Sequence, residues 1–301
     1  MWNDSEMSHN KLLGGIGCAA CETQKMKVLF DSAHGQKNWI QTGFYPRQMS
    51  STFSGLAKLF QELGFSCMDH RDRLVSAYLT EVQMLVIPSP TGHFNDSTQQ
   101  WERDESSLFT PPEIGDILSF LESGGGLVAF TYRFGDSFTK TNLRELTAAL
   151  GCILNDDVIV DLELLRNTRP FHTSFQTPAD CIVQDWARNG VSSVVWRPVS
   201  SFTMIVRSPA QPVVLSPKNC VSVSLDGHRI SHESVPICVA GKYGKGAYML
   251  FGGPQAFESS VKGFLDLPGN IKFMSNTLNW LIKNTESYRL AETSFRSDGH
   301  N

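Results

Sequence analysis

Residues 27–39 read KVLFDSAHGQKNW, and this stretch decides the fold. A short apolar run, Val28 to Phe30, ends at an acid, and a histidine, a glycine, an amide and a tryptophan follow at once. Short continuous apolar runs are typical of buried parallel strands. Open α/β sheets bind ligands in the crevice beyond the carboxyl ends of such strands. The stretch therefore predicts a parallel sheet with Asp31 and His34 at its mouth.

Apolar runs and helix-like segments then alternate along the first half of the chain. The expected strands are 27–31, 65–68, 84–87 and 127–132. The expected helices are 53–63 with Gly64 as its C-cap, 73–79, 110–121 and 142–150. This alternation is typical of a doubly wound parallel sheet with helices on both faces. The flavodoxin-like strand order 2-1-3-4-5 would place the crevice between the first and third strands.

Local signals set two helix starts and one loop. Thr110, followed by Pro111 and by Glu113, is the pattern of an N-cap with a capping box. Asn142 is expected to cap the next helix in the same way. The polar stretch 94–109 is expected to be a surface loop with Trp101 as its large anchor.

The pattern changes after about residue 158, where short β-like runs are separated by Pro, Gly and Ser. A final helix is expected from Asn270 to about Leu281. Residues 241–246 lack the phosphate-loop spacing and are better explained by a hairpin turn. With no linker to divide the chain, we expect a single α/β domain over 26–283 with a β-rich carboxyl-terminal half. Residues 1–25 would be a flexible arm and residues 284–301 a flexible tail.

Composition excludes several classes of function. Of the 301 residues, 41% are hydrophobic and 19% charged, as in ordinary soluble globular proteins. A formal charge of −4 leaves no basic excess for phosphates, so nucleic acid is not an expected partner. The chain shows no apolar run near the roughly 18 residues that span a bilayer and no signal peptide at its start. We therefore expect no membrane association and a cytoplasmic protein.

The cysteines agree with a reducing compartment. Seven are present, an odd and scattered set that argues against a disulfide framework. Cys18 and Cys21 form a Cys-Ala-Ala-Cys motif, but no second pair at similar spacing completes a zinc site. We interpret this motif as part of the amino-terminal arm, and its role stays open.

Two segments resemble a known family. One runs from Thr141-Asn142-Leu143-Arg144-Glu145-Leu146 through Gly151-Cys152-Ile153-Leu154-Asn155-Asp156-Asp157-Val158. The other is Pro236-Ile237-Cys238-Val239-Ala240-Gly241-Lys242-Tyr243-Gly244-Lys245-Gly246, followed by Phe251-Gly252-Gly253 and the helix of Asn276 to Trp280. Together they resemble the GIFT domain. That domain occurs in a subunit of intraflagellar transport complex B, in the gliding protein GldG and in relatives of the trehalose-utilisation protein, and its fold is similar to class I glutamine amidotransferases. The resemblance covers roughly residues 26–283.

The resemblance implies a fold more firmly than a function. Amidotransferases carry a nucleophilic cysteine on a sharp turn after a strand, whereas the corresponding stretch here, residues 130–135, has none. Glutamine hydrolysis is therefore not expected. The transport-complex relatives imply a protein–protein assembly module as one possible role.

The predicted crevice gathers polar side chains from several strand ends. Asp31 and His34 come from the first strand, with Gln36, Asn38 and Trp39 in an unusually long loop after them. Further side chains come from the strands opposite and from the flank: His93, Tyr132 and Arg133, with Thr91, Asn95, Asp96, Asp69 and His70 nearby. Such convergence suits a small polar ligand, with a tryptophan face for a sugar or base and an arginine for an anion.

Three functional hypotheses stay open at this point. The first is a protein that binds a small sugar-like or nucleotide-like ligand through these residues. The second is a hydrolase or lyase in which Asp31 orients His34 as acid and base. The third is the assembly module. Asp31 could instead simply cap loop amides, and a metal on Asp31, His34 and His93 is disfavoured because their spacing is loose. No metal is assigned, and no cofactor is identified.

Overall fold

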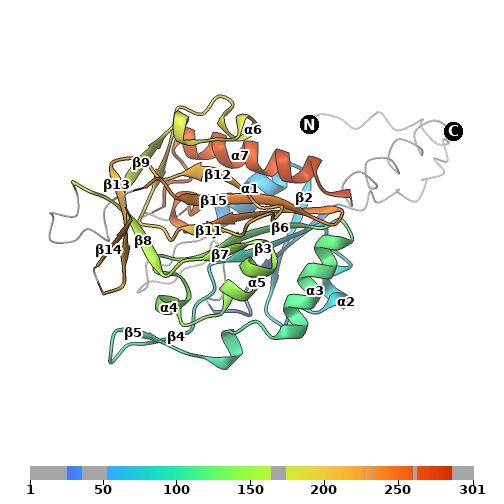
Figure 1. Cartoon of the computed structure of the whole chain (residues 1–301). Helices are drawn as coiled ribbons and strands as arrows, with labels where there is room; N and C mark the ends of the chain where they lie inside the picture. Colours follow the sequence, from blue (N-terminus) through green and yellow to red (C-terminus); the bar gives the residue numbers. More distant parts are fainter. Residues whose placement is uncertain are drawn as a thin grey trace, which may run out of the picture.

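The computed structural model describes residues 26–35, 53–163, 174–226, 228–231, 233–259 and 263–286. A central sheet lies between two layers of helices (Figure 1). In spatial order its seven strands are β12 (Gln211–Leu215), β15 (Pro236–Tyr243), β16 (Gly246–Phe251), β6 (Gly126–Phe130), β3 (Met84–Pro88), β1 (Met26–Asp31) and β2 (Phe65–His70). The expected arm and most of the expected tail lie outside the described residues.

The strands from β2 to β16 are parallel, and their order confirms the predicted 2-1-3-4-5 arrangement. Two antiparallel strands, β15 and β12, extend the sheet beyond β16. The turn from β15 to β16 is the predicted hairpin, and Gly244 there adopts φ 56°, which favours glycine. The topology is therefore flavodoxin-like, with an antiparallel edge.

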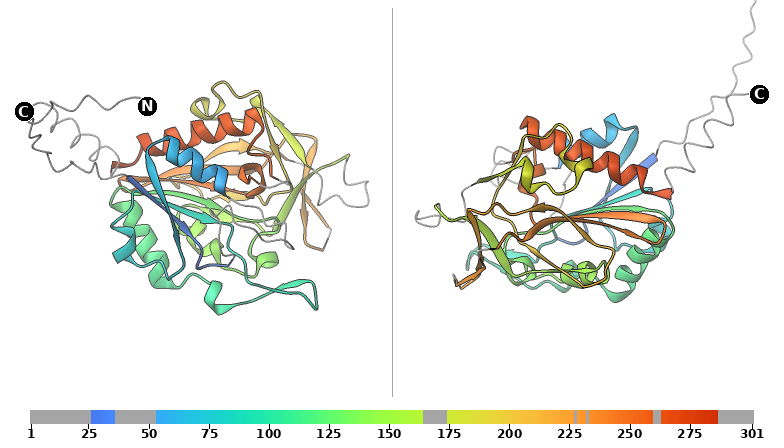
Figure 2. Two further views of the ribbon diagram at one scale, coloured as in Figure 1. Left: turned by 180° about the vertical axis from the view of Figure 1, so that it is seen from behind. Right: turned by 45° about the horizontal axis from the view of Figure 1, so that its top comes forward.

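The helices divide between the two faces of the sheet (Figure 2). On one face lie α1 (Ser54–Glu62), α6 (Asp185–Arg188) and α7 (Pro268–Lys283). On the other lie α2 (Ser76–Leu79), α3 (Pro111–Glu122) and α5 (Leu143–Ala149). A short helix, α4 (Gly135–Thr139), follows β6. The described residues also form the 3₁₀ turns η1 (Glu105–Ser107), η4 (Ala179–Cys181) and η5 (Gln255–Phe257).

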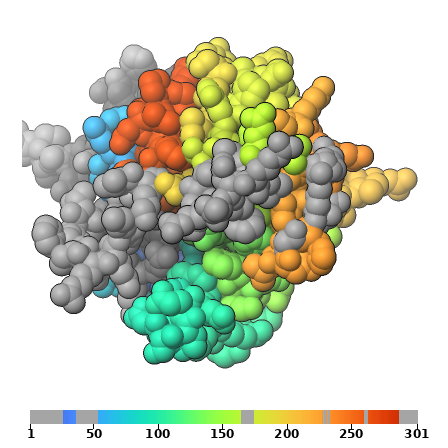
Figure 3. Space-filling model, turned by 90° about the vertical axis from the view of Figure 1, so that its left-hand side faces the viewer, coloured from blue at the N-terminus to red at the C-terminus, as the bar shows by residue number. Residues whose placement is uncertain are grey.

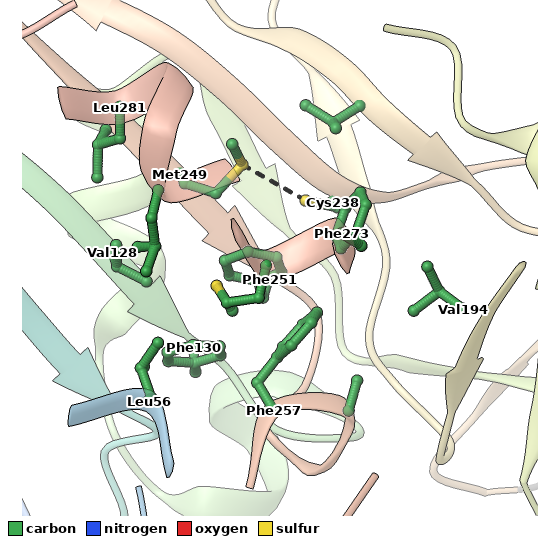
Figure 4. Packing of buried hydrophobic residues seen from close by; sticks show 14 of the residues in the cluster. Leu56, Val128, Phe130, Val194, Cys238, Met249, Phe251, Phe257, Phe273 and Leu281 are labelled. Atoms are coloured by element: carbon green, nitrogen blue, oxygen red, sulfur yellow. Dashed lines mark hydrogen bonds between the residues drawn. The ribbon is translucent and has the colours of Figure 1, made fainter. Parts of the chain in front are cut away.

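Successive side chains along each strand point to opposite faces of the sheet, so that a hydrophobic core forms on both faces. Val28 and Phe30 of β1 point into the core beneath α1 and α7, and Leu29 points into the core above α3. In the first of these cores Phe130 and Phe251 stack with ring centroids 4.9 Å apart, and Figure 4 shows the aromatic and aliphatic side chains around them. Strands buried on both faces explain why the apolar runs in the sequence are continuous.

Short strand pairs make up the β-rich second half. They are β7 (Cys152–Leu154) with β11 (Phe202–Met204), β9 (Phe175–Pro178) with β10 (Ser193–Trp196), and β8 (Asp157–Asp161) with β13 (Cys220–Ser224) and β14 (Arg229–Ser231). Figure 1 shows most of them gathered beyond one end of the central sheet.

One expected loop is a hairpin instead. Within 94–109 the chain forms β4 (His93–Asn95) and β5 (Gln100–Glu102), so the expectation of an irregular loop was wrong. Phe94 and Trp101 face each other across the pair, with ring centroids 5.1 Å apart, and the Asn95 side chain accepts hydrogen bonds from the turn amides. An aromatic cross-strand pair stabilises such a short ladder.

The two predicted helix starts had different outcomes. Thr110 and Glu113 form the expected capping box at α3. Asn142 makes no cap at α5, because its side chain bonds the backbone of Phe109, and Asp136 accepts from the first amides of α5 instead. The final helix begins at Pro268, slightly earlier than expected. Among the described residues, no helix has the length and apolar character needed to cross a membrane.

Candidate functional site

The loop after β1 folds back on the strand through Asp31. One carboxylate oxygen, Oδ1, accepts from the amide of Ala33 at 3.0 Å, and the other, Oδ2, lies 2.9 Å from Nδ1 of His34. The capping role and the orienting role expected of Asp31 are thus both present, on different oxygens. The imidazole is held against the strand end that precedes it.

Glu113 approaches the opposite edge of the same imidazole. Its Oε1 lies 3.3 Å from Nε2 of His34 and accepts from the amide of Leu74 at 3.0 Å. Its Oε2 accepts from the amide of Thr110 at 2.9 Å. The sequence indicated Glu113 only as a capping residue, so this contact was missed. His34 therefore lies between two carboxylates.

Arg73 and Phe109 complete the cluster. The Arg73 guanidinium places Nη1 3.1 Å from Oε2 of Glu113 and 3.4 Å from Nε2 of His34, and it donates to the carbonyl of Leu108 at 2.5 Å. The Phe109 ring covers the face of the His34 ring. We call these five residues, Asp31, His34, Arg73, Phe109 and Glu113, the His34 cluster.

The His34 cluster is sealed from solvent except at Arg73. The side chains of His34, Asp31 and Glu113 are 0%, 1% and 3% exposed, against 40% for Arg73. A buried charge is tolerated only when it is paired and hydrogen-bonded, and here the partners lie inside the cluster. In this arrangement His34 has no open edge from which to act on a ligand.

Hydrogen bonding keeps Glu113 ionised despite its burial. Burial is the largest single influence and raises the pKa of this carboxyl group. The hydrogen bonds from Thr110 and Leu74 and the nearby His34 together outweigh it, so the pKa is lowered overall. Glu113 is therefore an ionised anchor for Arg73 and for the imidazole.

Hydroxyl groups follow the ends of β3 and β6. The Ser89 hydroxyl donates to the carbonyl of Thr131 at 3.0 Å, and the Thr91 amide donates to the carbonyl of His34 at 3.3 Å. The hydroxyls of Thr91 and Thr131 are buried and have no hydrogen-bond partner among the described residues. Buried polar groups are normally satisfied, so these two hydroxyls leave bonding capacity unused at the sheet's carboxyl edge.

Tyr132 and Arg133 lie beyond the end of β6 at Phe130, whereas the expected strand ran on to Tyr132. The Arg133 guanidinium lies 5.6 Å from the ring centroid of Tyr132 and 5.4 Å from that of Phe138. Burial raises the pKa of the Tyr132 phenol, Glu258 adds to this, and Arg133 and Arg197 oppose it. The sequence did not indicate Arg197 or Glu258, which come from the β-rich half.

Of the remaining predicted ligand-binding residues, the structure describes His93, which is not part of the His34 cluster. His93 is exposed on the β4–β5 hairpin, which is teal in the end-on view of Figure 3, whereas the His34 ring is fully buried. The expectation that these two imidazoles share one open pit was wrong, because the hairpin carries His93 outward. Gln36, Asn38 and Trp39 lie outside the described residues. Asp31 and Glu113 contact opposite nitrogens of His34, and no group of metal ligands is found in the described part of the chain.

Comparison with known proteins identifies the fold. No family model and no curated protein matches the sequence. Among solved structures, the mmIFT52 N-terminal domain is similar with a TM-score of 0.60 at 17% identity, over 85% of this chain and 96% of that one. The chain has the GIFT-domain fold. The predicted resemblance is thereby confirmed for the fold.

Two bacterial proteins share this GIFT-like architecture. Cytoplasmic Protein STM1381 from Salmonella typhimurium matches with a TM-score of 0.52 at 14% identity, over 85% of this chain and 99% of its own. A ThuA-like protein from Bacteroides uniformis matches with a TM-score of 0.50 at 14% identity, over 91% and 98%. Both likenesses concern the fold, and they agree with the α/β architecture that the sequence predicted.

The strand-to-helix turn after β6 differs from a catalytic elbow. The residue held in the left-handed region is Phe134, with φ 61°, and Gly135 follows at φ 52°. The Phe134 side chain is buried, and its ring centroid lies 6.0 Å from that of Phe138. A non-glycine residue in this region is uncommon and strained, and such turns cluster at functional sites. Here the turn presents an apolar ring to the core.

Proposed function

We propose that this GIFT-like protein is a non-catalytic module that binds another protein. The observation that carries the proposal is the sealed His34 cluster, in which the acid and the imidazole suited to catalysis are consumed by internal contacts. The turn at Phe134, which offers an apolar ring in place of a nucleophile, supports the same conclusion. The fold shared with the IFT52 N-terminal domain fits an assembly role. We place this role in the cytoplasm.

The test compares binding with turnover in one preparation. Tagged protein is purified gently from its own host, and its mass is measured by size-exclusion chromatography with light scattering. We expect a protein partner to co-purify in stoichiometric amount. The His34→Gln variant should retain this partner when binding is measured below the unfolding temperature of the variant. A metabolite extract incubated with the wild-type protein should show no change that depends on His34. Conversion of a metabolite by the wild type and not by His34→Gln would overturn the proposal in favour of the hydrolase or lyase alternative.

A second candidate function is the binding of a small polar ligand at the strand ends. The observation that favours it is the pair of buried hydroxyls on Thr91 and Thr131, which lack a partner among the described residues. Tyr132 and Arg133 would add contacts to a sugar-like or nucleotide-like molecule, and we propose that Gln36, Asn38 and Trp39 also contribute. Thermal shift with a panel of sugars and nucleotides tests this. A ligand that stabilises the wild type should stabilise Thr131→Val less, and an equal shift in both proteins would exclude this site.

A further inference from the structure

A groove lies at the other end of the sheet from the His34 cluster. It has a volume of about 400 Å³ and is bordered by α6, α7, β12 and β15, which Figure 1 shows side by side. Its lining residues are Gln184, Trp186, Pro209, Gln211, Ala240, Gly241, Lys242, Trp280 and Asn284. Lys242 pairs in register with Ala247 at the start of β16, and so marks the amino edge of the parallel strands. We call this feature the tryptophan groove.

Two stacked indoles form one wall of the tryptophan groove. Trp186 of α6 and Trp280 of α7 have ring centroids 4.8 Å apart and planes inclined by 16°. The side-chain amide of Asn276 ties the two helices together by donating to the carbonyls of Ala187 at 3.0 Å and Asn189 at 2.8 Å. A preformed, half-exposed aromatic wall loses little conformational freedom on binding, which is why such walls act as anchor sites.

Lys242 is the one charged residue among those that line the groove. Lys242 is exposed and has no carboxylate partner in the described part of the chain. Two charged groups close to the groove residues in sequence are paired, Lys245 with Glu286 at 3.0 Å and Asp185 with Arg188. The electrostatic complement of the groove is therefore a carboxylate placed beside an apolar group.

Exposed apolar side chains also lie on the turn that precedes Pro209 in the chain. Val206 is 86% exposed and Ile205 is 38% exposed on this turn. The turn is fixed by the Ile205 amide, which donates to the carbonyl of Gly151 at 3.0 Å. Exposed apolar residues on a turn that leads to the groove lining offer further contacts to an extended polypeptide, which a compact small molecule would not reach.

We propose that the tryptophan groove binds a segment of a partner protein that carries a bulky apolar side chain next to an acidic residue. The apolar side chain lies against Trp186 and Trp280, the carboxylate contacts Lys242, and the flanking residues lie over Val206. This inference rests on the proposed function, because it names the surface through which the module would bind its partner.

The test uses a displayed library of random peptides of about 12 residues, selected against the whole protein. We expect enrichment of sequences with an aromatic or branched aliphatic residue beside Asp or Glu. The best peptide is labelled and its Kd is measured by fluorescence polarisation. Lys242→Glu should weaken it at least tenfold, about 1.4 kcal/mol, and Val206→Glu should weaken it severalfold. Lys272→Glu, an exposed change on α7 outside the groove lining, should leave the Kd unchanged.

A charge swap makes the result independent of folding defects. A peptide whose acidic residue is replaced by Lys should bind Lys242→Glu more tightly than it binds the wild type. If the enriched peptides bind Lys242→Glu and Val206→Glu with the same Kd as the wild type, the proposal that they bind in the tryptophan groove is wrong. If the peptides behave as expected but the host yields no stoichiometric partner, the tryptophan groove is confirmed as a peptide-binding site and the proposed function is wrong. If a host partner is found and both Lys242→Glu and Val206→Glu retain it, the proposed function is supported, and the proposal that the partner binds in the tryptophan groove is wrong.

Discussion

The imidazole of His34 stacks on the phenyl ring of Phe109, with ring centroids 3.9 Å apart and planes inclined by 15°. Phe109 lies just before α3, and Glu113 in the first turn of that helix contacts the ring edge. The loop after β1 is thereby fixed to the start of α3 through both a face and an edge of one side chain. The His34 cluster joins segments that are remote in sequence, which makes its energetic contribution measurable.

Replacing Glu113 by Gln should destabilise the protein by about 2 kcal/mol, since hydrogen bonds to a charged group contribute about 1.5–3 kcal/mol. The amide would place an NH₂ group among donors from Leu74, Thr110 and Arg73. Urea denaturation followed by tryptophan fluorescence measures the change. The matched control is Glu122→Gln, an exposed position on the same helix, which should stay within about 0.5 kcal/mol of the wild type. Equal stability of the two variants would contradict a supporting role for the cluster.

The contribution of Glu113 to the free energy of unfolding should disappear at acid pH. Although burial raises the pKa of this carboxyl, its hydrogen bonds and the nearby His34 lower it overall below the ordinary value of 4.5. As pH falls, the carboxyl of Glu113 therefore takes up a proton in the unfolded chain before it does so in the folded chain. Its stabilising contribution is complete at a pH above its pKa in the unfolded chain, and is lost as pH falls through its lower pKa in the folded chain. The free-energy gap between wild type and Glu113→Gln should be largest near pH 7 and shrink below pH 4.5. A gap that stays constant with pH would contradict this.

Replacing Gly35 and Gly115 by alanine should change the stability of the protein in opposite directions. Gly35 adopts φ 119°, and a Cβ there would lie 2.6 Å from the carbonyl oxygen of Thr91 and 2.7 Å from its amide nitrogen. Gly35→Ala should therefore destabilise by about 2 kcal/mol or more. Gly115 lies within α3, and a Cβ added there would meet no described atom within 4 Å, so Gly115→Ala should stabilise by about 0.5–1 kcal/mol. Thermal unfolding of both variants measures the signs, and a stabilising Gly35→Ala would show that the loop after β1 is not held against Thr91.

The core cysteines should be inert in the native protein. Burial raises the pKa of Cys152 and Cys220 to about 12 and that of Cys67 to about 11. Because the thiolate is the reactive form, iodoacetamide at pH 8 should label these residues slowly until the chain unfolds. Mass spectrometry of the peptides, with and without urea, reports each site separately. Native labelling of Cys152 as fast as labelling in urea would show that its core opens readily.

Local patterns predicted much of the fold, and contacts between remote residues explain most of what they missed. The apolar runs of β1, β3 and β6 and the capping box of Thr110 with Glu113 are local signals, so strand order and the start of α3 were predictable. The approach of Glu113 and Arg73 to His34 depends on how α3 packs beside the sheet, which no spacing encodes. The strands of the β4–β5 hairpin are too short to show a period, and their outward course placed His93 away from the cluster. Asn142 carried a valid cap signal, but Asp136 accepts from the same amides instead.

The position of β16 beside β6 matters while the chain is being made. β6 is complete at Phe130, yet the strand that covers its open side ends only at Phe251. At about 5–20 residues per second, a ribosome needs on the order of ten seconds to cover that gap. Throughout that interval the nascent chain presents an apolar strand with a bare row of amides and carbonyls, which is a template for pairing with a neighbouring polypeptide. Polysomes carrying this message are therefore where aggregation should begin, and a chaperone that shields the emerging β6 would raise the yield of folded protein.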